Sequence, residues 1–287
     1  MKAVFKHELR SYFHSLTAYL FIGFLLMFVG VGAMLYNIQS AVANFEYVLD
    51  FVGIGLVVII PILTMKVIAE EKKQKTDQLL YSLPLKTYEI IGGKFLALLV
   101  VFLIPMLIIA TYPLIFAKYG EVYLLTSYGS MIAFYIMGAA LISIGMFISS
   151  LTENIGFAAG IAIPVLLLNY FSVRLSEYIS ATAFGSLVAI VVIWLLLTFL
   201  IWYLTRKENL SFGIGMVGVI GICGVYYFKS DIFEGLLPKI MTQLSLFGRF
   251  DNFVDGIFDI TAIVFYLTVI FFFLFLSVQS LEKRRYN

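Results

Sequence analysis

The charged stretch at residues 69–94, AEEKKQKTDQLLYSLPLKTYEIIGGK, holds the residue types with the most scope for chemistry. It carries nine charged side chains, whereas only 13% of the whole chain is charged, and it lies between two long apolar runs. Opposite charges stand four residues apart in the pairs Glu71–Lys75 and Lys73–Asp77, a spacing that supports an exposed helix. The stretch therefore predicts a helix over residues 69–83 that leaves an apolar run and continues into water.

The same predicted helix carries an apolar stripe. Its members recur at helical spacing and are Thr76, Leu79, Leu80 and Leu83. Pro84 ends this helix, because the residue before a proline is pushed away from helical angles. Thr87 and Glu89 then open a second helix with a side-chain cap and an acidic residue at its positive end. A solvated loop does not need exposed leucines, so the stripe predicts a docking surface for a partner protein.

Two short stretches match part of a nucleotide-binding motif but lack the context or the residues that the motif requires. Residues 213–218, GIGMVG, match G-x-G-x-x-G, yet they lie in an apolar run and not between a strand and a helix. Small residues in such a run favour close helix packing. Residues 92–95, GGKF, fail as a phosphate loop because Tyr88 and Phe95 occupy positions that require Gly and Ser or Thr. The chain is therefore expected to bind no ATP and to carry no cofactor or catalytic site of its own.

The sequence also lacks the residues that a metal site or an ion-coupled carrier requires. The two histidines, His7 and His14, both lie near the N-terminus and cannot join Glu70 and Glu71 in a metal site built on later helices. We interpret these two glutamates as solvated helix charges. Asp50 and Asp259 stand at the ends of apolar runs, so no acidic residue lies in the middle of one, where ion-coupled carriers usually place it.

The composition defines the class of protein that must position these residues. Of the 287 residues, 62% are hydrophobic and 17% aromatic, and the mean hydropathy is +1.03, which leaves too little polar surface for a soluble globule. The net charge is only +2, so it implies no nucleic-acid partner. The single cysteine, Cys223, excludes an intramolecular disulfide and a multi-cysteine metal site. The sequence predicts an all-α polytopic membrane protein in a lipid bilayer.

Eight runs are long enough to be membrane spans, since about 20 apolar residues cross the hydrocarbon as a helix. They are residues 16–36, 48–68, 95–117, 126–149, 155–172, 183–204, 211–228 and 259–280. The fifth and seventh are short and rich in glycine, so they either cross or are re-entrant, broken or tilted. The prediction is one transmembrane domain over residues 1–287 with about eight spans, six to eight in all, and no soluble domain.

The distribution of basic residues predicts the orientation of these spans. With a cytoplasmic N-terminus, 14 of the 19 Lys and Arg residues fall on the cytoplasmic side and five on the outer side. The outer five are Lys118, Arg174, Lys229, Lys239 and Arg249. Because basic residues are retained on the cytoplasmic side, and because the number of spans is even, both termini are expected in the cytoplasm.

Two segments beside the spans read as interfacial helices. In residues 1–15, Phe5, Leu9 and Tyr12 form an apolar side, and Lys2, Lys6 and Arg10 step by four along another, which suits a helix lying on the inner leaflet. A second apolar stripe lies in the outer segment 229–258. Pro238 either interrupts that stripe or marks the first turn of a shorter helix.

The stretch 69–94 is similar to the cytoplasmic coupling segment of the ABC type-2 permeases, the membrane subunits of ATP-driven bacterial exporters. The matching positions are Glu71, Lys72, Thr76, Leu79, Leu80, Pro84, Gly93 and Lys94. Lys75 departs from the family pattern, which commonly has Gly before the Thr; we expect the change to be tolerated because a helix interior disfavours glycine. The segments KHELRSYFHSLTAYLF and SSLTENIGFAAGIA also resemble the family, and the carboxyl end resembles its gliding-motility-type subgroup.

The resemblance implies a transmembrane permease subunit in the plasma membrane of a bacterium. Residues 69–93 would dock on a separate cytoplasmic ABC ATPase, of which two copies would hold the ATP and Mg²⁺. The docking residues would be Glu71, Lys72, Thr76, Leu79, Leu80, Leu83, Pro84, Glu89 and Lys94. A second permease subunit, identical or homologous, would complete the exporter.

Two other classes stay open from the residues alone. One is a secondary transporter that works without ATP, against which stands the absence of a mid-span charge. The other is a membrane anchor that docks a cytosolic partner without transport. The transported substrate is not indicated, because an aromatic, apolar interior is expected of any membrane core.

Overall fold

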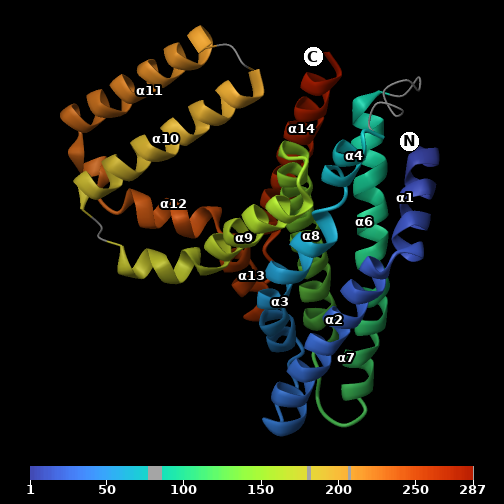
Figure 1. Ribbon diagram of the computed structural model, residues 1–287. Coiled ribbons are helices and arrows are strands. Elements are labelled where there is room, and N and C mark those ends of the chain that lie inside the picture. The colour runs from blue at the N-terminus through green and yellow to red at the C-terminus, as the bar shows by residue number, and fades with distance from the viewer. Residues whose placement is uncertain (77–85, 180–181, 206–207, 287) are drawn as a thin grey trace.

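The computed structural model describes residues 1–76, 86–179, 182–205 and 208–286, which form helices joined by short connections and contain no strand (Figure 1). The first helices are α1 (Lys2–His14), α2 (Leu16–Ala33), the π-helix η1 (Met34–Gln39), α3 (Glu46–Thr64), α4 (Ala69–Gln74), α6 (Thr87–Ile109) and α7 (Thr111–Phe116). They are followed by α8 (Leu124–Leu151), α9 (Ile155–Tyr178), α10 (Ala183–Thr205), α11 (Glu208–Phe228), the 3-10 helix η2 (Ser230–Phe233), α12 (Leu236–Leu244), α13 (Leu246–Val254) and α14 (Ile260–Tyr286).

Seven helical stretches among the described residues are long and apolar enough to cross a membrane. They are Leu16–Gln39, Glu46–Gln74, Thr87–Phe116, Leu124–Leu151, Ile155–Tyr178, Ser211–Phe228 and Ile260–Arg284. The sixth predicted run falls on α10, which contains the shorter apolar stretch Ala183–Phe199. The prediction of an all-α polytopic membrane protein with about eight spans is confirmed. The fifth run, left open by the sequence, forms a helix of 24 residues.

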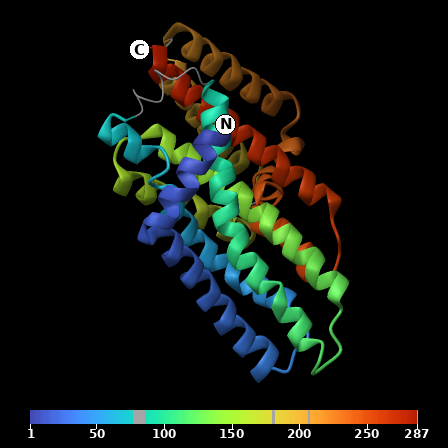
Figure 2. The same ribbon diagram turned by 90° about the vertical axis from the view of Figure 1, so that its right-hand side faces the viewer.

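Five helices, α2, α3, α6, α8 and α14, form an elongated bundle (Figures 1 and 2). Both termini and α4 lie at one end, called here the terminal end, and the α2–α3 and α7–α8 connections lie at the other, called the loop end. In the most apolar 18 residues of α8, 83% are buried, so this helix is the centre of the bundle. It carries glycine where neighbours come close: a Cβ at Gly138 would lie 2.2 Å from the ring of Phe102.

The helices α10 and α11 stand to one side of the bundle and pack mainly on each other (Figure 1). The Trp194 indole of α10 donates a hydrogen bond to the Ile214 carbonyl of α11 at 3.3 Å and occupies the space beside Gly218. Only 11% of the α11 span is buried. Its exposed apolar side chains suit contact with lipid, so this pair depends on the bilayer more than on the bundle.

The segment 229–258 contains two short α-helices instead of one interfacial helix. Pro238 stands in the first turn of α12, where the missing N–H of proline costs no hydrogen bond. The next helix, α13, packs into the protein through its buried side chains Leu246, Phe247, Phe250 and Phe253. Tyr266 of α14 donates to the Leu246 carbonyl at 2.9 Å. This contact fixes α13 against the bundle.

Candidate functional site

The predicted coupling segment begins where α3 breaks at the terminal end. The helix ends at Thr64, and after a short turn α4 starts at Ala69. The first amides of α4 have no acceptor within their own helix, and Ser149 of α8 supplies one. Its Oγ accepts from the amides of Ile68 at 3.2 Å and Ala69 at 3.1 Å, and donates to the Met65 carbonyl at 3.1 Å. A serine of another helix therefore caps α4 and holds it to α8.

A second attachment of α4 lies at the neighbouring residue of α8. Lys72 is buried, with 6% of its surface exposed, and its ammonium donates to the carbonyl of Ser150. The hydroxyl of Ser280, on α14, donates to the same carbonyl at 2.9 Å. Helices α4, α8 and α14 thus meet around one backbone oxygen at the terminal end. Lys72, which the charge pattern placed in an exposed helix, is therefore a buried residue.

Lys94 of α6 ties three more parts of the chain together in a buried ion-pair cluster. Its Nζ lies 2.7 Å from Glu8 Oε1 of α1, 2.7 Å from Glu71 Oε1 of α4 and 3.1 Å from the Val67 carbonyl. An ammonium has three N–H donors, so each donor of Lys94 has an acceptor. Only 1% of the Lys94 side chain is exposed. The expectation that Glu71 is a solvated charge is wrong.

The face of α1 that packs toward this cluster contains both apolar and polar side chains. The predicted basic side is confirmed as exposed, but the opposite side is centred on the buried residues Val4, Glu8 and Tyr12. Tyr12 donates to the Leu63 carbonyl at 3.3 Å, and its burial, with the nearby carboxylates of Glu8 and Glu71, raises the pKa of its phenol well above 10. The phenol therefore stays a neutral donor at physiological pH. Figure 2 shows α1 beside α6.

Gly93 allows that close approach of α1 to α6. A Cβ at this position would lie 3.1 Å from Val4 Cβ and 3.2 Å from the Met1 carbonyl oxygen, which is tighter than side chains normally accept. The Gly-Lys pair at 93–94 therefore has a structural reason: the glycine admits α1, and the lysine binds it. Both residues act at the same contact.

The helix predicted over residues 69–83 is wrong at Lys75 and Thr76, and residues 77–83 lie outside the described residues. α4 ends at Gln74, and Lys75 has a φ of 58°, in the left-handed region. The amide of Thr76 bonds to the Glu71 carbonyl at 3.1 Å, and that of Lys75 to the Lys72 carbonyl at 3.3 Å, the pattern of a helix C-terminus closed by a left-handed residue. Glycine is favoured there, so the reason given for tolerating Lys75, a helix interior, is wrong as well.

The structure describes only some of the remaining predicted residues. Leu79, Leu80, Leu83 and Pro84 lie outside the described residues, as does Asp77. The second helix begins at Thr87 as predicted, but the cap comes from Glu89, whose carboxylate accepts from the Lys86 amide at 3.1 Å. The structure thus brings Glu71, Lys72 and Lys94 together and places Thr76 and Glu89 at the two edges of the segment.

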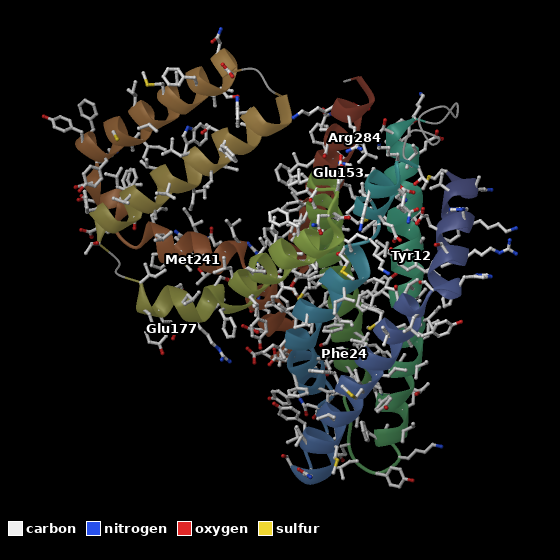
Figure 3. All side chains as sticks on the ribbon, viewed as in Figure 1. Tyr12, Phe24, Glu153, Glu177, Met241 and Arg284 are labelled. Carbon is white, nitrogen blue, oxygen red and sulfur yellow. The ribbon has the colours of Figure 1, made fainter. Side chains whose placement is uncertain are left out.

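The turn between α8 and α9 lies beside this site. Glu153, in that turn, forms an ion pair with Arg284 near the end of α14 (Figure 3). The hydrogen bond and positive charge of Arg284 lower the pKa of the Glu153 carboxyl below its ordinary value. The terminal end therefore collects polar contacts from α1, α4, α6, α8, α9 and α14.

Sequence reasoning missed Glu8, Ser149 and Ser150, and it placed Tyr12 on an apolar side without its role as a hydrogen-bond donor. A signal for Glu8 was available, because it stands four residues from both Val4 and Tyr12 and thus shares their face. Lys94 also carried a signal, since a lysine inside an apolar helix needs a partner of opposite charge. The two serines gave none, because nothing local distinguishes them from other serines in the span.

The described residues contain no group of three or more His, Cys, Asp or Glu side chains suited to a metal ion. A family model described as ABC-2 family transporter protein matches residues 31–176, which is just over half of the chain and includes α3, α4, α6 and α8. No curated protein and no solved structure matches. With its apolar helices and its matched helical core, the chain belongs to the ABC-2 family of transporter proteins, as a membrane component of transport.

Proposed function

We propose that the chain is the permease subunit of an ABC exporter in a bacterial plasma membrane, driven by a separate cytoplasmic ATPase. Two copies of the ATPase would bind ATP and Mg²⁺, and a second permease, identical or homologous, would complete the complex. Both termini would be cytoplasmic, which makes the terminal end the cytoplasmic end. The resemblance of the carboxyl end favours the gliding-motility-type subgroup.

The observation that carries this proposal is the attachment of α4. The coupling segment begins on a helix that Ser149 caps and that Lys72 and Glu71 hold to α8 and α6. A displacement applied to residues 77–85 by a partner therefore reaches several bundle helices through short polar contacts. Packed helices linked in this way move as units between discrete arrangements. Such a linkage suits a transporter better than an anchor that only holds a partner.

The docking itself is assigned to the leucines of the segment. Leu79, Leu80 and Leu83 are the apolar residues that would fill a groove of the ATPase, and such anchors dominate interfaces at about 2 kcal/mol or more each. The exposed Lys73 would contribute on the order of 0–1 kcal/mol, since a solvated charge adds little.

The test is recovery of the ATPase with a tagged chain purified in mild detergent from its own host. The double change Leu79→Asp and Leu80→Asp is expected to abolish ATPase recovery while membrane insertion stays intact. Leu125→Asp, at an exposed leucine of the loop end, is the matched control and should recover the ATPase as the parent does. Unchanged recovery with the double variant would defeat the coupling proposal and favour an ATP-independent transporter or an anchor.

Orientation and the site of hydrolysis are tested separately. In a Cys223→Ser background, a cysteine added at Asn287 should react with an impermeant maleimide only after cells are permeabilised. Labelling of intact cells would contradict the cytoplasmic terminus. The purified chain without its partner should hydrolyse no ATP, and turnover that survives removal of contaminating ATPases would contradict the division of labour between subunits.

A further inference from the structure

The exposed side of α1 carries a row of positive charges. Lys2, Lys6 and Arg10 step by four along this side, and all three are exposed. None of them has an ion pair within 4 Å among the residues that the structure describes. The only acid of α1, Glu8, is buried and pairs with Lys94 on the opposite side of the helix. Three cations therefore face outward without a counter-ion in the described part of the chain.

The position of α1 in the chain places this row beside a membrane span. Ser15, whose backbone is extended, is the single residue between α1 and the span that begins at Leu16. In the first turns of that span, Leu16, Tyr19 and Leu20 are exposed side chains that suit contact with lipid. Because α1 ends one residue before these side chains begin, it lies at the boundary between hydrocarbon and water.

Aromatic side chains mark the same boundary. The ring of Phe13, at the end of α1, packs edge-on against the ring of Tyr19, with the ring centroids 6.1 Å apart. Tyrosine is enriched where the hydrocarbon meets the lipid headgroups. Phe5 and Leu9, which are half-buried, continue the apolar side from Phe13 along α1, next to the row of cations. Basic residues beside an apolar side are the arrangement of a helix at the level of the headgroups.

We propose that α1 binds the headgroups of anionic phospholipids through Lys2, Lys6 and Arg10. An anionic headgroup supplies the negative charge that the three cations lack, while its acyl chains lie beside the exposed start of α2. An acidic protein fits less well, because the apolar side chains that adjoin the cations favour contact with acyl chains. This surface depends neither on an ATPase partner nor on the side of the membrane that the terminal end faces.

The experiment is titration of the purified full chain in a neutral detergent with a phosphatidylglycerol and with a phosphatidylcholine of the same acyl chains, followed by native mass spectrometry. The parent is expected to bind the phosphatidylglycerol more tightly. The combined change Lys2→Gln, Lys6→Gln and Arg10→Gln should weaken phosphatidylglycerol binding about tenfold or more, since each basic residue near a membrane surface adds about fivefold. All three side chains are exposed, so the fold is not at risk. Unchanged binding would overturn the proposal.

A matched variant separates this surface from the total charge of the protein. The combined change Lys118→Gln, Lys229→Gln and Lys239→Gln removes the same charge at exposed positions outside α1. It should bind phosphatidylglycerol as the parent does, which would support the assignment to α1. Equal weakening in the two triple variants would show that the lipid responds only to net charge, and would overturn the proposal.

Two further tests address the chemistry. The charge-conserving combination Lys2→Arg, Lys6→Arg and Arg10→Lys should keep the preference for phosphatidylglycerol, and its loss would overturn the assignment to charge. Glycerol 3-phosphate, which has a charged phosphate but no acyl chains, should not displace the lipid at equal concentration; displacement would indicate a site for soluble phosphates and overturn the assignment to lipid. Equal affinity of the parent for the two lipids would leave the cations to solvent or to an acidic protein, and would also overturn the proposal.

Discussion

Charged residues gather in two regions of the molecule, and they do so in opposite ways. At the terminal end, Lys94 is buried between Glu8 and Glu71 and has an acceptor for each of its donors. Near α13, Asp251 belongs to an exposed acidic group with Asp50 and Asp255. The structure shows no ion pair within 4 Å for Asp251 among the residues it describes.

The two regions differ in how the stability of the protein responds when one charge is removed. Although Asp251 is exposed at the surface, neighbouring protein atoms partly desolvate its carboxyl. This desolvation, followed by the negative charges of Asp50 and Asp255, raises the pKa of Asp251 to about 6, although Arg174 acts in the other direction. Neutralising Asp251 therefore relieves repulsion. Neutralising Lys94 instead removes the buried cation that the carboxylates of Glu8 and Glu71 share. The same kind of substitution has opposite effects on stability, because stability depends on the partner and not on the residue type.

The largest expected effect follows from Lys94→Met, which removes the buried cation that Glu8 and Glu71 share. Breaking a buried ion pair from one side costs about 3 kcal/mol or more. Unfolding in detergent micelles measures this loss, with Lys73→Met at an exposed site of α4 as the matched control. Adding Glu8→Gln and Glu71→Gln to Lys94→Met should recover part of the loss. A triple variant less stable than Lys94→Met would show that the cluster is not electrostatic in origin.

A smaller loss is expected for Ser149→Ala at the same end. The change removes one acceptor from the amides of Ile68 and Ala69 and one donor from the Met65 carbonyl, which should cost about 1–3 kcal/mol. Ser143→Ala is the matched control, because that buried serine donates only to the Ala140 carbonyl of its own helix. Equal losses in the two variants would argue against the cap between helices.

The terminal end also contains a position where a change should stabilise. Lys75→Gly relieves a left-handed residue at the end of α4, and this conformation costs an L-residue about 1 kcal/mol or slightly more. Lys75→Ala, which removes the same side chain but keeps the Cβ, should bring no such gain. The unfolding midpoints of the two variants give the comparison, and a larger gain for the alanine variant would contradict the observed backbone conformation.

The smallest effect is expected at Asp251. With the folded pKa near 6 and the ordinary value at 3.8, the folded protein keeps a proton between these values that the unfolded chain releases. Stability therefore falls as the pH rises through this window, and the penalty is complete above pH 6. Asp251→Asn removes it, with a gain below about 1 kcal/mol because the side chain is exposed and screened. A stability difference that stays constant from pH 4 to 7 would contradict this.

The spans could be predicted from the sequence because hydrophobic length is a local property. The runs around α2, α3, α6 and α8 needed only the thickness of a bilayer. The attachment of α4 could not be predicted in the same way, since the partners of Glu71 and Lys72 are Lys94 and Ser150, on other helices. The end of α4 at Gln74 could not be predicted for a related reason: the sequence spacing of Glu71 and Lys75 showed neither the left-handed backbone of Lys75 nor the pairing of Glu71 with Lys94.

Helix α14, which follows all the other described helices in the chain, covers α8, the most enclosed span of the bundle. The ring of Phe273 on α14 lies 5.6 Å from that of Phe147 on α8, and this pair shares the most extensive packing among the helices that the structure describes. Because the ribosome delivers the N-terminal part first, α8 is synthesised with its α14 side still uncovered. Closure of the core is therefore a late event of biosynthesis, whereas α10 and α11 can leave the insertion machinery as a finished pair.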